Sequence, residues 1–243
     1  MRYCFSILVV LVSSFGCRDI FAAPGWSITT DADFFFSRLQ NTLQPQGNTW
    51  DDRSLTRFVT KTIPLTDKNY EPSDLIALSG SSVEQAGRNS YLRQDAYTAL
   101  DAMGRDFRKT FGKPLVVISG YRSALYQQRL WDLGRCTDTL CAPPGYSEHQ
   151  LGLAIDIFDA STAADYMKNA LYKKYITWVQ KNAHLYGYTQ SYQGWPSVDG
   201  YDIEPWHWRY VWVELATKLW KLGMSYSEYI EFESMRDIFL MLP

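Results

Sequence analysis

The chain has 243 residues, of which 46% are hydrophobic and 21% charged, and its formal net charge is -2 at pH 7. This composition is that of a folded globular protein rather than a disordered one, and the length allows one sizeable domain with extensions. A weakly negative chain lacks the basic face that a nucleic-acid-binding protein needs, so we expect no nucleic-acid partner.

The first 23 residues have the pattern of a signal peptide. The apolar run at residues 4–12 is too short to span a membrane and fits the core of a targeting segment. Cleavage after Ala23 predicts an exported protein of the periplasm or cell envelope, and Cys17 offers the alternative of a lipoprotein attached to the membrane. Residues 24–61 are expected to form an amino-terminal extension that packs on the domain or leads to it.

The segment from residue 91 to residue 134 predicts a helix, a strand and a second helix. Apolar residues recur at three- and four-residue spacing over 91–110, which indicates an amphipathic helix. Residues 114–119 are rich in β-branched side chains and predict a buried strand. Residues 123–134 predict a helix that starts at a serine and stops at a glycine. The turn between strand and helix would present Arg122 over the edge of the sheet.

Residues 147–156 read SEHQLGLAID and contain two candidate metal ligands, His149 and Asp156. Aliphatic side chains alternate with small ones over 151–158, which predicts a strand that is buried on its aliphatic side. His207 is a candidate third ligand, and the carboxylate three residues before it is available as a base.

The remainder of the chain predicts helices, a loop and one more strand. Residues 159–186 predict a helix that ends near His184, where a lone histidine is more often a packing residue than a ligand. Turn formers and aromatic residues at 188–203 predict a variable loop over the cleft. A last strand at 204–211 leads into another helix. The tail at 225–243 is expected to dock on the domain, because its apolar end is too short to span a membrane.

Cys136 and Cys141 lie in a loop that also contains two prolines. In an exported protein this spacing is most simply a local disulfide. A zinc thiolate site is the weaker interpretation, because it would need two more soft ligands nearby. The disulfide would stiffen the loop that delivers Ser147 and His149.

Two motifs, SxHxxGxAxD at residues 147–156 and ExWHxRYV at residues 204–211, resemble those of the zinc D-alanyl-D-alanine carboxypeptidases of the VanY type. The wider superfamily includes the D-Ala-D-Ala dipeptidases, the phage L-alanyl-D-glutamate endopeptidases and the hedgehog amino-terminal domain. The resemblance extends from about residue 62 to about residue 223, so it covers the expected body of the chain.

The patterns and the resemblance together predict an α+β fold. The expected architecture is a small antiparallel sheet with helices packed around it and the zinc site at its edge, with strands at residues 114–119, 151–158 and 206–213. We place the zinc peptidase domain at residues 62–224 and expect a monomer.

The resemblance also implies roles for individual residues. His149, Asp156 and His207 would bind Zn²⁺, and Glu204 would act as the general base without binding the metal. Arg122 would bind the substrate and take part in catalysis, because a guanidinium can hold a carboxylate or brace a developing oxyanion. The remaining substrate contacts would be Gln127, Ser147 and Trp206.

Two residues of the motifs also have a structural interpretation. Ser147 has the alternative role of capping or bracing the loop before His149. Arg209 is expected to form a buried structural pair rather than to contact the substrate.

The resemblance implies hydrolysis of carboxy-terminal D-Ala from peptidoglycan stem peptides. An L,D-carboxypeptidase or a peptidoglycan endopeptidase on the same scaffold is the alternative enzyme. A non-catalytic zinc-bearing binding module is a third hypothesis, but such a module has no reason to keep both the base Glu204 and the anchor Arg122.

Overall fold

The computed structural model describes residues 48–158, 163–194 and 199–241. The predicted signal peptide, with its cleavage after Ala23 and the lipidation alternative at Cys17, lies outside these ranges, as does most of the extension expected at residues 24–61. Within the described residues no helix is both long enough and apolar enough to cross a membrane.

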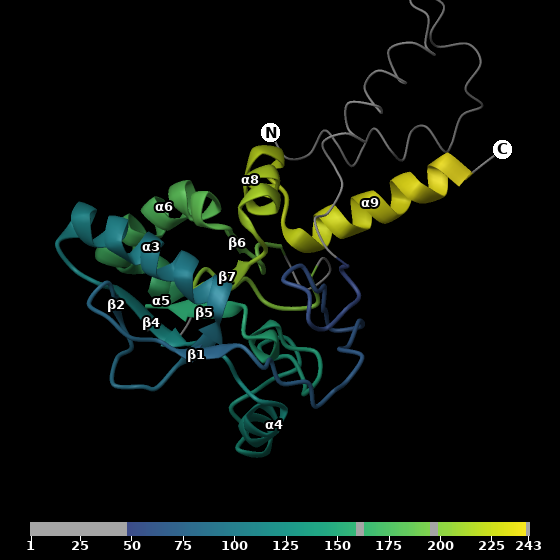
Figure 1. Ribbon diagram of the computed structural model, residues 1–243, viewed down its shortest axis with the longest axis horizontal. Helices are drawn as coiled ribbons and strands as arrows, with labels where there is room; N and C mark the ends of the chain where they lie inside the picture. Colours follow the sequence, from purple (N-terminus) through teal and green to yellow (C-terminus); the bar gives the residue numbers. More distant parts are fainter. Residues whose placement is uncertain (1–47, 159–162, 195–198, 242–243) are drawn as a thin grey trace, which may run out of the picture. The chain divides into compact units, whose positions relative to one another are not determined.

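A five-stranded sheet forms the centre of the fold (Figure 1). Its strands lie side by side in the order β2 (Val83–Glu84), β4 (Leu115–Ser119), β5 (Ala154–Ile157), β7 (His207–Tyr210) and β6 (Tyr188–Gln190). Neighbouring strands are antiparallel, except that β2 and β4 pair in parallel. A separate antiparallel pair is formed by β1 (Leu75–Ala77) and β3 (Tyr91–Arg93). The predicted α+β class is confirmed.

Helices accompany this sheet in the described part of the chain. They are α3 (Gln94–Phe111), α4 (Ala124–Asp132), the 3₁₀-helix η1 (Glu148–Leu151), α5 (Ala163–Lys168), α6 (Ala170–Asn182), the 3₁₀-helix η2 (Ala183–Tyr186), α8 (Val213–Leu222) and α9 (Tyr226–Met241). Figure 1 shows α3 and α6 next to each other, and the ring of Phe107 on α3 contacts Trp178 on α6. α4 lies apart from this pair in the same view.

One face of α3 supplies much of the core. Leu100, Met103 and Phe107 recur at the spacing of an amphipathic helix and are fully buried. The Phe107 ring lies 5.4 Å from Trp178 in a T-shaped contact and 5.9 Å from Phe158. Because Phe158 directly follows β5, this aromatic cluster anchors the end of the central strand.

The strand expected at residues 151–158 begins later than predicted. Residues 148–151 form η1, and Gly152 has a left-handed backbone with φ 66°, so strand pairing starts at Ala154. A Cβ at Gly152 would lie 2.9 Å from Leu75 Cδ2. Both the backbone conformation and the close approach therefore require glycine.

The helix expected at residues 159–186 is interrupted. The Asn169 side chain accepts hydrogen bonds from the backbone N–H groups of Leu171 and Tyr172, and this cap separates α5 from α6. The loop expected at residues 188–203 begins with the strand β6, which pairs with β7. Three residues are too few for a periodic pattern to reveal a strand.

The segment before residue 62 and the start of α9 contact each other. Tyr226 donates a hydrogen bond from its hydroxyl to the carbonyl of Thr56. Its ring meets Phe58 edge-on, with the ring centroids 5.2 Å apart. Tyr226 and Phe58 are both buried, so the first turn of α9 is part of the folded body.

Arg209 has the buried structural position that was expected, and its partners are backbone groups. Arg209 is fully buried, as predicted, but its Nη2 donates to the backbone carbonyls of Leu55 and Arg57, at 3.1 Å each. Its hydrogen-bond partners in the described chain are therefore backbone carbonyls rather than a carboxylate. Since Arg209 lies on β7, these bonds attach the segment around residue 56 to the central sheet.

Replacing Phe107 with alanine is expected to lower the free energy of unfolding by about 3–5 kcal/mol, because a fully buried ring is lost and a cavity remains. Urea denaturation followed by circular dichroism measures this change. Leu125→Ala on α4 is the matched control, since Leu125 is 80% exposed and its loss should change stability by less than about 0.5 kcal/mol. Equal losses in the two variants would contradict the core assignment.

Candidate metal centre and active site

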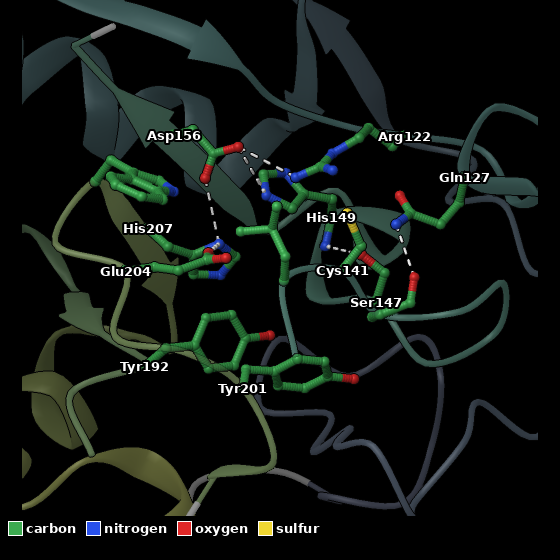
Figure 2. Close-up of a pocket in the computed structure, with 13 residues that line it drawn as sticks. Arg122, Gln127, Cys141, Ser147, His149, Asp156, Tyr192, Tyr201, Glu204 and His207 are labelled. Atoms are coloured by element: carbon green, nitrogen blue, oxygen red, sulfur yellow. Dashed lines mark hydrogen bonds and ion pairs between the residues drawn. The ribbon is translucent and has the colours of Figure 1, made fainter. Parts of the chain in front are cut away.

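His149, Asp156 and His207 converge in the structure (Figure 2). They come from η1, β5 and β7, and one donor atom of each lies within 4.8 Å of the others. His149 Nε2 is 3.3 Å from Asp156 Oδ2, and His207 Nδ1 is 3.3 Å from Asp156 Oδ1. Asp156 and His207 are paired directly across β5 and β7. The strand register therefore makes these two side chains neighbours on one face of the sheet.

Hydrogen bonds determine which ring nitrogen of each imidazole faces the candidate metal position. His149 donates through Nδ1 to the carbonyl of Gly120 at 2.7 Å, which leaves the Nε2 lone pair toward Asp156. His207 donates through Nε2 to Glu148 Oε2 at 2.8 Å, so Nδ1 is the nitrogen that faces Asp156. Partners of this kind fix the tautomer and the ring orientation of metal-binding histidines.

Sequence reasoning missed Glu148. Its carboxylate is buried and accepts a second hydrogen bond from Ser191 Oγ at 2.7 Å. The residue stands between Ser147 and His149 inside the first motif, but nothing in the local pattern links it to His207, which is 59 positions away. The short helix η1 turns Glu148 toward β7.

The donor set fits a tetrahedral zinc ion. Each imidazole lies 3.3 Å from a different oxygen of Asp156, and one donor atom of each of the three residues lies within 4.8 Å of the others. Ligand atoms at this separation are within reach of a single ion with bonds of about 2.0–2.2 Å. In the described part of the chain, His149 Nε2 and Asp156 Oδ1 are buried without a hydrogen-bond partner. Such atoms are costly unless a further group binds them. Two imidazoles and a carboxylate are a common ligand set of catalytic zinc.

The charges around His207 favour a cation. Burial alone would lower the pKa of His207, but the nearby Asp156 and Glu148 carboxylates outweigh burial and raise the pKa to about 10. Burial, with the neighbouring Arg122, lowers the pKa of His149 to about 4, so that imidazole is neutral. The carboxylates thus stabilise positive charge at the position where a divalent ion would supply it.

Glu204 lies beside the three ligands and faces the cavity. Its Oε2 is 3.6 Å from His207 Nδ1, and its side chain is buried. The His207 N–H donates to the Glu204 carbonyl, so Glu204 occupies a turn before β7 rather than the strand expected to begin at residue 204. Burial raises the pKa of Glu204 to about 7. That value suits proton exchange near neutral pH.

Arg122 occupies the strand-to-helix turn, as predicted, and points toward Asp156 (Figure 2). Its Nη2 donates to Asp156 Oδ2 at 3.1 Å, and its backbone N–H donates to the carbonyl of His149. Ser123 caps α4 and so fixes the turn. The guanidinium lines the cavity, and its Nε has no hydrogen-bond partner among the described residues.

The other three predicted substrate contacts also line the cavity. Gln127 is buried and donates from Nε2 to the Ala142 carbonyl at 2.7 Å, while its Oε1 has no partner in the described chain. Ser147 Oγ accepts the backbone N–H of His149, which supports its alternative role as the cap of η1. Trp206 borders the cavity from the segment that leads into β7.

Several residues that line the cavity were not predicted. They are Leu140, Cys141, Ala142, Tyr192 and Tyr201. The disulfide between Cys136 and Cys141 is present, as expected. The Tyr192 ring centroid lies 4.5 Å from that of His207. The aromatic composition of residues 188–203 indicated a loop over the cleft, but it did not show which rings face inward.

His184 lies outside the ligand cluster, as expected. Its ring stacks on Trp220 with 4.1 Å between the centroids. Burial lowers its pKa, and the residue belongs to the packing between η2 and α8.

Residues 89–213, just over half of the chain, match the family model described as VanY: D-alanyl-D-alanine carboxypeptidase. The chain belongs to this family. The matched region of this VanY-family chain includes Arg122, the three candidate ligands and Glu204. The resemblance predicted from the two motifs is therefore confirmed.

Relatives and solved structures agree with this membership. YodJ of Bacillus subtilis (strain 168) is 35% identical over 171 residues, which cover 67% of this chain and 62% of YodJ, so the chain spans less than two thirds of that relative. The structure of the LdcB LD-carboxypeptidase has a TM-score of 0.64 and 32% identity, covering 74% of this chain and 87% of that one. A mutant of the vancomycin-resistance D,D-pentapeptidase VanY in complex with Zn(II) has a TM-score of 0.54 and 25% identity, covering 73% and 99%.

Replacing Glu148 with alanine is expected to weaken binding of a divalent metal about 10–100-fold, because His207 loses the carboxylate that orients it. Titration of Zn²⁺ in competition with a chromophoric chelator measures the dissociation constant. Glu84→Ala is the matched control, since that carboxylate is exposed on β2 and should not affect affinity. A Glu148→Ala protein that is folded by circular dichroism and binds Zn²⁺ with unchanged affinity would contradict the orienting role.

Proposed function

We propose that the chain is a zinc-dependent D-alanyl-D-alanine carboxypeptidase that removes carboxy-terminal D-Ala from peptidoglycan stem peptides. The observation that carries this proposal is the convergence of His149, Asp156 and His207 beside Glu204, in a cavity that also contains Arg122. Membership of the VanY family and the similarity to a VanY structure with Zn(II) support it.

Three side chains of this chain would hold the zinc ion. His149 would bind through Nε2, His207 through Nδ1 and Asp156 through a carboxylate oxygen. When bound, zinc acts as a Lewis acid that polarises the scissile carbonyl and lowers the pKa of water from about 15.7 toward roughly 7. Gly120 and Glu148 hold the two imidazoles in the tautomers that this binding requires.

Glu204 would accept the proton of the attacking water and then deliver it to the leaving amine. Its carboxylate is buried on the cavity wall, 3.6 Å from His207 Nδ1. Because burial raises its pKa to about 7, the protonated and ionised forms are both accessible near neutral pH. A positioned acid–base group of this kind typically contributes about 10²–10⁴-fold to the rate.

Arg122 would bind the terminal carboxylate of the substrate. One of its N–H groups pairs with Asp156, and the residue lines the cavity. A guanidinium binds a carboxylate through two parallel hydrogen bonds. Such an anchor favours cleavage of the last residue over cleavage inside a peptide. Gln127, Ser147 and Trp206, which also line the cavity, would complete the substrate contacts.

The proposal also covers where the protein acts in the cell and which residues form its peptidase domain. Peptidoglycan lies outside the cytoplasmic membrane, so residues 1–23 would direct export to the periplasm or cell envelope, with a lipidated Cys17 as the alternative anchor. Residues 62–224 would be the peptidase domain of a monomer. Residues 24–61 would be an amino-terminal extension, and residues 225–243 a carboxy-terminal tail.

An L,D-carboxypeptidase that trims tetrapeptide stems is the second candidate. The observation that favours it is the likeness to the LdcB LD-carboxypeptidase, at 32% identity against 25% for the VanY D,D-pentapeptidase. The two activities share the zinc site, the base and the carboxylate anchor. They differ in the configuration of the residue that precedes the terminal D-Ala.

Mass spectrometry of defined stem peptides separates the candidate activities. We expect the zinc-loaded protein to remove one alanine from a pentapeptide that ends in D-Ala-D-Ala, to lose this activity on chelation and to regain it with Zn²⁺. Release of D-Ala from the tetrapeptide alone would establish the L,D-carboxypeptidase instead. Cleavage of internal bonds would indicate an endopeptidase, and intact peptides in the presence of bound zinc would refute all three.

Glu204→Ala is expected to lower kcat by about 10²–10⁴-fold while Zn²⁺ still binds, because the residue supplies the base and not a ligand. Steady-state release of D-alanine and the zinc content of the purified variant are the two measurements. Turnover at the original rate would remove Glu204 from the mechanism, and loss of zinc would make it a ligand.

A further inference from the structure

The loop from Cys136 to Ala142 forms a part of the cavity wall to which the catalytic roles assign nothing. A disulfide between Cys136 and Cys141 closes the loop. Leu140, Cys141 and Ala142 all line the cavity, and Leu140 is 41% exposed. These three residues have small or aliphatic side chains, whereas the other described residues that line the cavity are polar or aromatic.

α4 braces this wall from one side. The side chains of Gln127 and Trp131 both donate to the Ala142 carbonyl, at 2.7 and 3.2 Å. The same helix starts directly after Arg122, the proposed carboxylate anchor. Figure 2 shows Cys141 on the side of the cavity that holds Gln127, across from Glu204. The wall is therefore fixed relative to the anchor.

The segment that carries the base braces the loop from the other side. The Thr139 carbonyl accepts the Asp202 N–H at 2.8 Å, and the Thr139 hydroxyl donates to the Asp202 carboxylate at 2.9 Å. Asp202 lies next to Tyr201, which lines the cavity, and two residues before Glu204. One short loop thus connects the two sides of the cleft.

Backbone hydrogen bonds and an ion pair restrain the loop in addition to the disulfide. The N–H groups of Leu140 and Cys141 both donate to the Thr137 carbonyl at 3.1 Å. Lys61 Nζ pairs with the Asp138 carboxylate at 2.7 Å. A loop closed and bonded in this way has few alternative conformations, so its inward side chains present a surface of fixed shape.

We propose that the loop at residues 136–142 is the specificity wall for the carboxy-terminal residue of the substrate. The inference rests on the proposed carboxypeptidase function. With the terminal carboxylate at Arg122, Leu140 and Cys141, which line the same cavity, would contact the methyl group of a terminal D-Ala and would disfavour a longer side chain. The disulfide, by holding both sides of the cleft, sets this limit on size.

Leu140→Ala tests the wall directly. The peptides are matched stems that end in D-Ala or in D-Leu, and the readout is the ratio of their kcat/KM values. We expect the unaltered protein to prefer D-Ala, and Leu140→Ala to reduce that preference at least about tenfold. Leu125→Ala on exposed α4 is the matched control and should leave the ratio unchanged. If Leu140→Ala leaves the ratio of kcat/KM values unchanged, the loop is not the specificity wall.

The paired variant Cys136→Ser with Cys141→Ser tests the contribution of the disulfide. We expect KM for the D-Ala peptide to rise and the preference over D-Leu to fall, while the zinc content stays the same. A disulfide that only stabilises the fold would lower the melting temperature without changing the preference. That result would overturn the specificity role of the disulfide.

Equilibrium binding separates failure of the wall from failure of the proposed function. Dissociation constants of both peptides are measured in the Glu204→Ala background, with and without Leu140→Ala. A shifted binding ratio without hydrolysis by the unaltered protein would refute the peptidase and keep the wall. Hydrolysis with unshifted ratios would keep the peptidase and refute the wall, and absence of binding would refute both.

Discussion

The candidate active site depends on the antiparallel pairing of β5 with β7. Asp156 and His207 are partners in this register, and a slip of one strand by one residue would turn one of them to the opposite face of the sheet. On the other edge of β5 lies β4, which leads to Gly120 and Arg122. Gly120 orients His149, and Arg122 pairs with Asp156. Three adjacent strands therefore position the candidate ligands and the candidate anchor.

Ionisable groups are buried around this pairing, which is costly unless each charge has a partner. Asp156 has His149, His207 and Arg122. Glu148 has His207 and Ser191. Burial alone would raise the pKa of both carboxylates, but these partners outweigh it and lower the values. The two carboxylates therefore remain ionised and make the site favourable for a cation. Such a cluster is easier to explain as a metal site than as a contribution to stability.

The positions for chemistry and for recognition come from different parts of the chain. The candidate ligands lie on or next to strands of the central sheet, whose backbone hydrogen bonds hold them rigidly. The cavity rim comes from loops, namely the disulfide loop and the segment that contains Tyr192 and Tyr201. Loops on a rigid scaffold can change without disturbing the scaffold. The proposed chemistry and the proposed choice of peptide would thus be separable in this fold.

The sequence by itself determined the features that depend on residue type and spacing along the chain. These are the α+β class, the ligand candidates His149, Asp156 and His207, the candidate base Glu204 and the local disulfide, since each leaves a readable pattern. Only the tertiary structure decided that Glu148 orients His207, that Tyr192 faces the site and that Arg209 bonds to backbone carbonyls. It also decided the late start of β5 and the existence of β6. Those features depend on contacts between distant segments, and no local pattern records such contacts.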